Sequence, residues 1–203
     1  MLTTKETAEL FKLAKDAVST YLREGCRIEP PSILNEGLRE KRLGVFITLS
    51  RLDDTSGKRE TVACCGIPLP TKPLIETIID VAVSAAVRAK LLSTMKADEI
   101  DMLRMEVSII TQQKPIRVNN PVRYIQKIKI GEDGLMVERG IFKGILLPHI
   151  PVEKGWDATE FLSECCTKAG LPPDSWLGRD VKIFKFKTLT LKGKSGRLLR
   201  SQL

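Results

Sequence analysis

The chain of 203 residues has a single histidine, and its five cysteines do not follow the spacing of a disulfide framework or a zinc site. Cys26 stands alone, while Cys64 with Cys65 and Cys165 with Cys166 form adjacent pairs. Neighbouring residues of a strand point to opposite faces, and those of a helix diverge by about 100°, so adjacent thiols do not converge on one ion. We therefore predict no metal, no cofactor, and thiols that stay reduced.

Long apolar runs are also missing. No segment approaches the roughly 18 to 20 uninterrupted apolar residues of a membrane helix, and the first residues carry no stretch of the signal-peptide type. We therefore expect a cytoplasmic protein without membrane contact. Charged residues make up 29% of the chain, whereas Asn and Gln together number only seven, a composition typical of thermophiles.

Nucleotide-binding loops are absent from the sequence. The triplet Gly193-Lys194-Ser195 looks like the end of a phosphate-binding loop, but Thr188 stands where that motif needs its first glycine. No G-x-G-x-x-G occurs either. The sequence therefore gives no support to ATP or NAD binding.

Clear helix and strand signals alternate along the chain. A capping box of Thr3 and Glu6 starts a helix that Gly25 ends, a second helix runs from Pro73 to about Leu92, and a third lies between Asp157 and Gly170. Alternating apolar residues predict strands over 43–49, 61–67, 103–109, 135–137, 141–147 and 181–191, and around Ile128, with a turn over 53–57 and turn glycines at 134 and 140. Hairpin-length connections favour an α+β fold with mostly antiparallel sheets flanked by helices.

Several short motifs carry a family resemblance: Asp133-Gly134-Leu135, Gly144-Ile145-Leu146-Leu147-Pro148, Gly155-Trp156-Asp157 and Lys168-Ala169-Gly170-Leu171-Pro172-Pro173. With these residues the chain resembles the AMMECR family over nearly its whole length. The resemblance implies one AMMECR-type domain over 1–203, built of two closely joined subdomains with a cleft between them. We expect the segment Pro148–Gly155 to be irregular. Trp156, directly after it, is predicted to act as a hydrophobic staple against Phe161.

The family motif Leu-Arg-Gly-Cys-Ile-Gly is degraded here. Its positions read Thr61, Val62, Ala63, Cys64, Cys65 and Gly66, of which only Cys64 and Gly66 match. Valine cannot replace the cationic fork of an arginine, so any family activity that needs this arginine is in doubt. An Asp-Pro-Arg-Phe-Pro-like segment is likewise replaced by residues 91–96. Both departures indicate a divergent member.

Two residues are candidates for catalysis, and each has a plainer interpretation. Cys64 is either a nucleophile or a packed strand residue, and no base is recognisable for it, since His149 has no evident relation to it. Glu106 is either a general base or a solvated residue on the outer face of a strand. Whether the protein is an enzyme stays open at this point.

Positive charge gathers at the end of the chain. Residues 179–203 hold eight basic residues and one acid, which is 8 − 1 = +7 of the net +8. We predict that Phe184 and Phe186 face the core, and that this end either is solvated or contacts nucleic-acid phosphates. The nucleic-acid candidates are Lys182, Lys185, Lys187, Lys192, Lys194, Arg197 and Arg200, and residues 192–203 read as a basic C-terminal tail that is either ordered or disordered.

Three functions remain. The resemblance implies an RNA-associated role, including RNA modification, which the basic end supports. It also implies a role as an interaction or scaffold protein that works with Memo-type and radical-SAM proteins. A third hypothesis is an enzyme that acts on a small molecule in the cleft.

Overall fold

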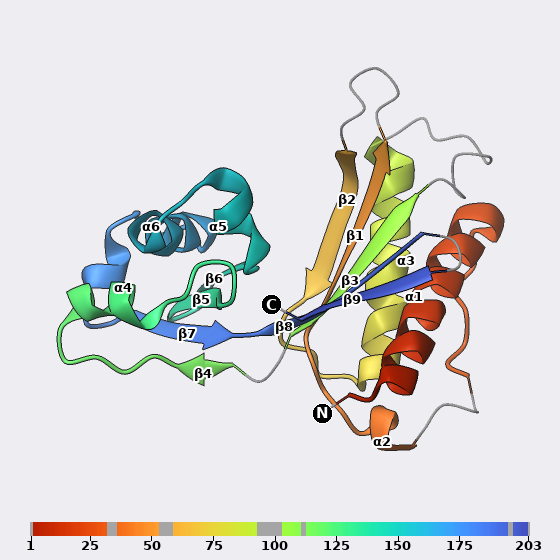
Figure 1. Ribbon diagram of the computed structural model, residues 1–203, viewed down its shortest axis with the longest axis horizontal. Coiled ribbons are helices and arrows are strands. Elements are labelled where there is room, and N and C mark those ends of the chain that lie inside the picture. Colours follow the sequence, from red (N-terminus) through yellow and green to blue (C-terminus); the bar gives the residue numbers. More distant parts are fainter. Residues whose placement is uncertain are drawn as a thin grey trace. The chain divides into compact units, whose positions relative to one another are not determined.

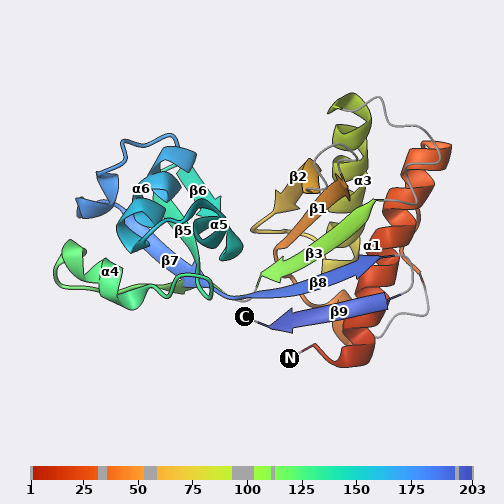
Figure 2. The same cartoon turned by 45° about the horizontal axis from the view of Figure 1, so that its top comes forward.

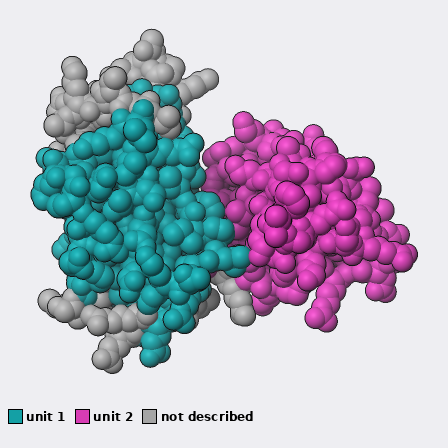
Figure 3. All heavy atoms as spheres, turned by 180° about the vertical axis from the view of Figure 1, so that it is seen from behind, with its two compact units in different colours: residues 1–109, 189–202 teal, residues 110–188, 203 magenta. Residues whose placement is uncertain are grey.

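The computed structural model describes residues 2–31, 36–52, 59–92, 103–110, 113–194 and 197–202. The predicted turn over 53–57 and residues 93–96 of the second motif lie outside these ranges. Among the described helices, none is long and apolar enough to span a membrane. The chain divides into two compact units, unit 1 with residues 1–109 and 189–202 and unit 2 with residues 110–188 (Figure 3). The α+β prediction is confirmed, and the cleft stays a prediction.

Unit 1 is a five-stranded sheet with two long helices on one face (Figures 1 and 2). The strand order is β2-β1-β3-β8-β9, and the helices are α1 (Thr4–Glu24) and α3 (Leu74–Leu92). The strands are β1 (Val45–Leu52), β2 (Arg59–Ile67), β3 (Arg104–Ile110), β8 (Thr188–Lys194) and β9 (Arg197–Gln202), and a short α2 (Glu36–Arg39) precedes them. In the described part of the chain, β2 and β9 are the outer strands.

Local sequence explains the helices of unit 1. Thr3 Oγ1 accepts a hydrogen bond from the Glu6 amide at 3.2 Å and Glu6 Oε2 accepts one from the Thr3 amide at 2.6 Å, which confirms the predicted capping box. Gly25 ends α1 in the left-handed conformation with φ 74°. The small side chains of α3 are fully buried and let it lie close to α1 and the sheet: Ala82, Ala85, Ala86 and Ala89.

Unit 2 is a four-stranded sheet in the order β4-β7-β5-β6. Its strands are β4 (Lys114–Pro115), β5 (Gly134–Arg139), β6 (Phe142–Leu146) and β7 (Lys182–Phe186). Its helices are α4 (Tyr124–Lys127), α5 (His149–Lys154) and α6 (Ala158–Lys168), with 3-10 turns η2 (Pro121–Arg123) and η3 (Ser175–Leu177). A separate core of this unit forms mainly between α6 and strands β5, β6 and β7.

Helix α6 lies unusually close to β6. A Cβ atom at Gly144 would meet the Cys165 carbonyl oxygen at 2.4 Å and the Ala169 amide nitrogen at 2.5 Å, both of them backbone atoms. The Cys165 thiol, fully buried, donates toward the carbonyl oxygens of Leu135 at 3.6 Å and Gly144 at 3.5 Å. The glycine and the small thiol therefore make this contact between helix and sheet feasible.

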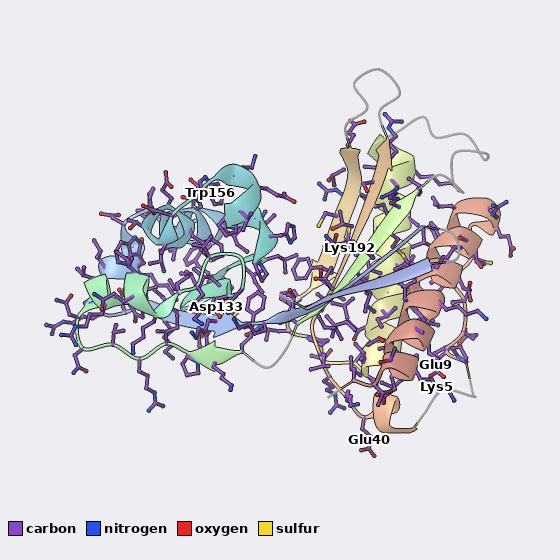
Figure 4. All side chains as sticks on the ribbon, viewed as in Figure 1. Lys5, Glu9, Glu40, Asp133, Trp156 and Lys192 are labelled. Atoms are coloured by element: carbon purple, nitrogen blue, oxygen red, sulfur yellow. The ribbon has the colours of Figure 1, made fainter. Side chains whose placement is uncertain are left out.

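The start of α6 follows the prediction. Asp157 Oδ1 accepts hydrogen bonds from the amides of Thr159 at 2.7 Å and Glu160 at 2.8 Å, and Glu160 Oε2 accepts one from the Asp157 amide. Trp156, labelled in Figure 4, is half-buried against the core that contains the fully buried Phe161. Trp156 thus packs on the core of unit 2, and its direct contact with Phe161 stays a prediction.

Four local predictions are wrong. Ile128 is a buried loop residue after α4, and the segment before Trp156 contains α5. Gly134 begins β5 instead of forming a turn, because the Phe186 ring lies where its Cβ would be, at 2.3 Å. The strand expected over 181–191 is two strands in different sheets, and the apolar alternation changes phase between Phe186 and Leu189, where the sheets change.

We expect Gly144→Ala to lower the free energy of unfolding by about 3 kcal/mol, because the added methyl group meets rigid backbone. Ile141→Ala, at a 90% exposed position next to the same strand, should change it by less than about 0.5 kcal/mol. Denaturant unfolding of both variants measures the difference. Equal stability of the two variants would show that α6 and β6 do not approach this closely.

Candidate functional site

A row of polar side chains crosses the sheet of unit 1 on the face opposite its helices. In the strand register Thr48 of β1 is opposite both Cys64 of β2 and Glu106 of β3. The residues beside them along the strands point the other way, into the core under α1 and α3: Ile47, Leu49, Ala63, Met105 and Val107. The structure thus brings both predicted catalytic candidates onto one face.

Direct contacts join this row in two pairs. Thr48 Oγ1 lies 3.4 Å from Cys64 Sγ and donates a hydrogen bond to it. Lys192 of β8, labelled in Figure 4, places its Nζ 3.0 Å from Glu106 Oε2. Strand neighbours lie about 4.8 Å apart, so two strand spacings separate Cys64 from Glu106 by roughly 10 Å. Glu106 therefore does not take the proton of Cys64 directly, and its carboxylate serves the ion pair.

A second row of residues on the same face, next to the first, is partly buried. The hydroxyl oxygens of Ser108 and Thr190 lie 3.2 Å apart and both residues are buried. Phe46 is opposite Ser108 on one side and Gly66 on the other. The Phe46 ring occupies the place of a Cβ at Gly66, which it would meet at 2.3 Å. The motif glycine is therefore required for packing on this face.

Three further motif residues, Val62, Ala63 and Cys65, pack in the core of unit 1 or against it, whereas Thr61 is exposed. The register between β1 and β2 shifts after Leu49, so that Val62 has no partner of its own and forms a β-bulge. Val62 belongs to the core of unit 1 with 8% of its surface exposed, where the family motif has arginine. Cys65 is half-buried on the helix side; burial raises the pKa of its thiol, and the Arg88 charge partly opposes this.

The other thiols and the histidine differ in exposure and in the unit to which they belong. Cys26 is exposed, whereas Cys165 and Cys166 are buried, and burial raises the pKa of Cys165 to about 12. His149 begins α5 in unit 2, while Cys64 belongs to unit 1. Within the described residues, no group of three or more His, Cys, Asp and Glu side chains can hold a metal ion.

Most of the predicted nucleic-acid lysines that the structure describes are engaged by acids. Lys187 Nζ lies 2.9 Å from Glu132 Oε2 and 3.1 Å from Asp133 Oδ1, and Lys185 Nζ lies 3.3 Å from Asp133 Oδ2. Lys192 pairs with Glu106, as above, and Lys182 is exposed. The side chains of Lys194, Arg197 and Arg200 lie outside the described part, although β8 and β9 include their backbones. Phe186 is buried and Phe184 half-buried.

Asp133 is the acid that organises these lysines (Figure 4). Its side chain is 2% exposed, and its Oδ2 also accepts a hydrogen bond from the Lys129 amide at 2.9 Å. Burial alone raises the pKa of this carboxyl, but the hydrogen bonds and charges of Lys129, Lys187 and Lys185 outweigh burial and hold the pKa below its usual value. Asp133 is therefore a charged anchor between the turn before β5 and strand β7.

A different basic surface lies on unit 2. Residues 111–131 contain five basic residues and no acid. We call the basic surface the following exposed side chains: Lys114, Arg117, Arg123, Lys127 and Lys182. Across the described ranges, no ion pair joins any of them to an acid. Sequence reasoning missed this surface because it counted charge at the chain end, where density is higher.

Strand pairing places two members of the basic surface side by side. Lys114 is opposite Lys185, and the Ile116 amide donates to the Ile183 carbonyl at 2.8 Å, so the same alignment brings Arg117 level with Lys182, on the other face of the sheet from Lys114. Lys185 Nζ also donates to the Lys127 carbonyl oxygen at 2.8 Å. The segment from β4 to α4 thus lies along β7 (Figure 1).

The fold and the motif positions define an α+β chain with two antiparallel sheets and a cysteine in the middle of an outer strand. The family model AMMECR1 matches residues 11–191, and the chain belongs to this family. The expected family membership is thereby confirmed.

Similar proteins carry names without a function. A protein of Thermococcus gammatolerans is 45% identical over 87% of this chain and 85% of its own length, and protein MK0488 of Methanopyrus kandleri is 43% identical over 92% and 87%. The crystal structure of uncharacterized protein PH0010 from Pyrococcus horikoshii has a TM-score of 0.85 and 41% identity, covering 96% of both chains. The thermophilic composition fits relatives from these archaea.

We expect iodoacetamide to alkylate Cys26 and Cys64 first in the native protein, because both are exposed. Cys65 should react more slowly, and Cys165 and Cys166 only after unfolding. Mass spectrometry of digests taken over time identifies each thiol, and Cys64→Ser should remove one fast site. A native Cys64 that resists alkylation would show that this face of the sheet is covered.

We expect Asp133→Asn to destabilise the protein by about 2 kcal/mol at pH 7, because two lysines lose a buried partner. The lowered folded-state pKa means that the stabilisation is present above the unfolded pKa, about 3.9, and is lost as pH falls through the folded pKa. Thermal melting of both proteins from pH 7 to pH 2 should therefore show curves that converge below about pH 4. A constant difference over this range would contradict the ionised state of Asp133.

Proposed function

We propose that this protein binds RNA through the basic surface of unit 2. The observation that supports the proposal is the group of exposed, unpaired cationic side chains along β4, η2, α4 and β7 in the described part of the chain. Lys and Arg in such a group neutralise phosphates and release counterions, which supplies affinity without reading sequence. The proposed interface does not include Lys185, Lys187 and Lys192, because their charges already have acidic partners.

A second candidate function is that of an enzyme for a small molecule at the sheet face of unit 1 that carries Cys64. It is favoured by the exposed Cys64 with the Thr48 hydroxyl bonded to its sulfur. The family resemblance also implies that this site acts on bound RNA, and this stays a prediction. A role with Memo-type or radical-SAM proteins stays a prediction as well.

RNA binding is tested by fluorescence anisotropy with a mixed-sequence single-stranded RNA at several salt concentrations. If the five side chains of the basic surface each neutralise one phosphate, log K should fall with log salt at a slope of about −3.5. The triple variant Arg117→Glu, Arg123→Glu, Lys127→Glu should lose at least about 100-fold in affinity, and its slope should move toward zero.

The matched control carries the same change of charge elsewhere. Lys12→Glu, Lys15→Glu and Lys90→Glu replace exposed residues of α1 and α3, and both triple variants have a net charge of 8 − 6 = +2. The control should keep most of the affinity. Equal losses in the two variants would reduce the binding to net charge and would contradict an interface on unit 2.

A further inference from the structure

We infer that the RNA bound by the basic surface is single-stranded and that one of its bases lies against an apolar step made of Val122 and Leu177. This inference rests on the proposed function. Val122 is 56% exposed and Leu177 46% exposed. They belong to η2 and η3, which contact each other in unit 2 although about 50 residues of chain separate them. Arg123, of the basic surface, follows Val122 directly.

The charges around the step differ from those around the exposed apolar residues of the turn between β5 and β6. Ile141 is 90% exposed and Phe142 49% exposed at the turn between β5 and β6. The basic residues beside that turn are held by acids, Arg139 by Asp180 at 2.7 Å and Lys143 by Glu138 at 3.1 Å. Val122, in contrast, directly precedes Arg123, which has no ion pair with an acid in the described part of the chain.

Polar groups for a base edge also lie next to the step. Asn120 caps η2 by accepting the Val122 amide on its Oδ1 at 3.1 Å, which orients the side-chain amide at the start of the turn. Asn119 and Gln126 are exposed on either side of it in the chain. Amide groups can both donate to and accept from the edge of an unpaired base.

The chemistry of this surface suits unpaired bases. In an RNA duplex the bases are stacked inside and present phosphates and 2′-hydroxyls to a protein, so an apolar step would gain nothing. A single strand can turn a base out onto apolar or aromatic side chains while cations hold the flanking phosphates. The acidic residues nearest the step in the chain are Asp174, which precedes η3, and Asp180, which pairs with Arg139, and neither forms an ion pair with Arg123 in the described part.

The test compares one mixed-sequence RNA as a single strand and as a duplex with its complement, at the same low salt, by fluorescence anisotropy. We expect the single strand to bind at least about tenfold more tightly. The double variant Val122→Ser, Leu177→Ser should lower single-strand affinity by about 5- to 30-fold, the range for losing one stacked base, without changing duplex affinity or the salt slope. The control Ile141→Ser, also at an exposed apolar position, should bind as the unchanged protein does.

The outcomes separate this inference from the proposed function. Equal affinity for duplex and single strand, or a double variant that binds the single strand normally, overturns the inference while RNA binding stands. Loss of affinity in Ile141→Ser as large as in the double variant overturns it as well. The absence of RNA binding at low salt, or binding that the charge-reversal variant of the basic surface does not weaken, overturns both. Circular dichroism and melting of each variant exclude unfolding as the cause of a loss.

Discussion

The buried carboxylate of Asp133 is the interaction on which unit 2 depends. A charge removed from water must be paired, and here the Lys129 amide and the ammonium groups of Lys185 and Lys187 pair it. These contacts join the turn before β5 to strand β7, and Lys185 extends them to the carbonyl of Lys127 in α4. The same pairing engages Lys185 of β7 and Lys187 just after it, whereas Lys114, Arg117, Arg123 and Lys127 form no ion pair with an acid in the described ranges.

Interactions between residues close in sequence were predictable, and those between distant residues were not. Thr3 with Glu6 and Asp157 with Glu160 are three residues apart, so the pattern alone predicts both capping boxes. The apolar alternation changes phase across Lys187, from Phe184 and Phe186 to Leu189 and Leu191, but this shift does not tell which sheet each half joins. Ile128 looks like a strand residue since burial in a loop leaves the same apolar signature.

The candidate site likewise has features that the sequence predicts and features that only the strand pairing shows. Glu106 was predictable as a residue of an outward strand face. Cys64 was expected as either a nucleophile or a packed strand residue, and its exposure and its common row with Thr48 and Glu106 follow only from the structure. The basic surface combines Lys182 with residues of 114–127, which strand pairing brings together. Charge counted along the chain favoured the terminal segment, but the acids that neutralise its lysines come from elsewhere in the sequence: Glu106, Glu132 and Asp133.

The bulge at Val62 also affects whether a strand of another copy of this chain can pair with the edge of the sheet. An outer strand offers a row of backbone amides and carbonyls to which a strand of another molecule can bond. In β2 an extra residue interrupts the regular repeat of that row in the middle of the strand, and bulges increase the local twist. A strand of another molecule could form regular backbone hydrogen bonds with β2 on one side of Val62, but not continuously across it. The residue that replaces the family arginine thus lies where the sheet resists growth by strand addition.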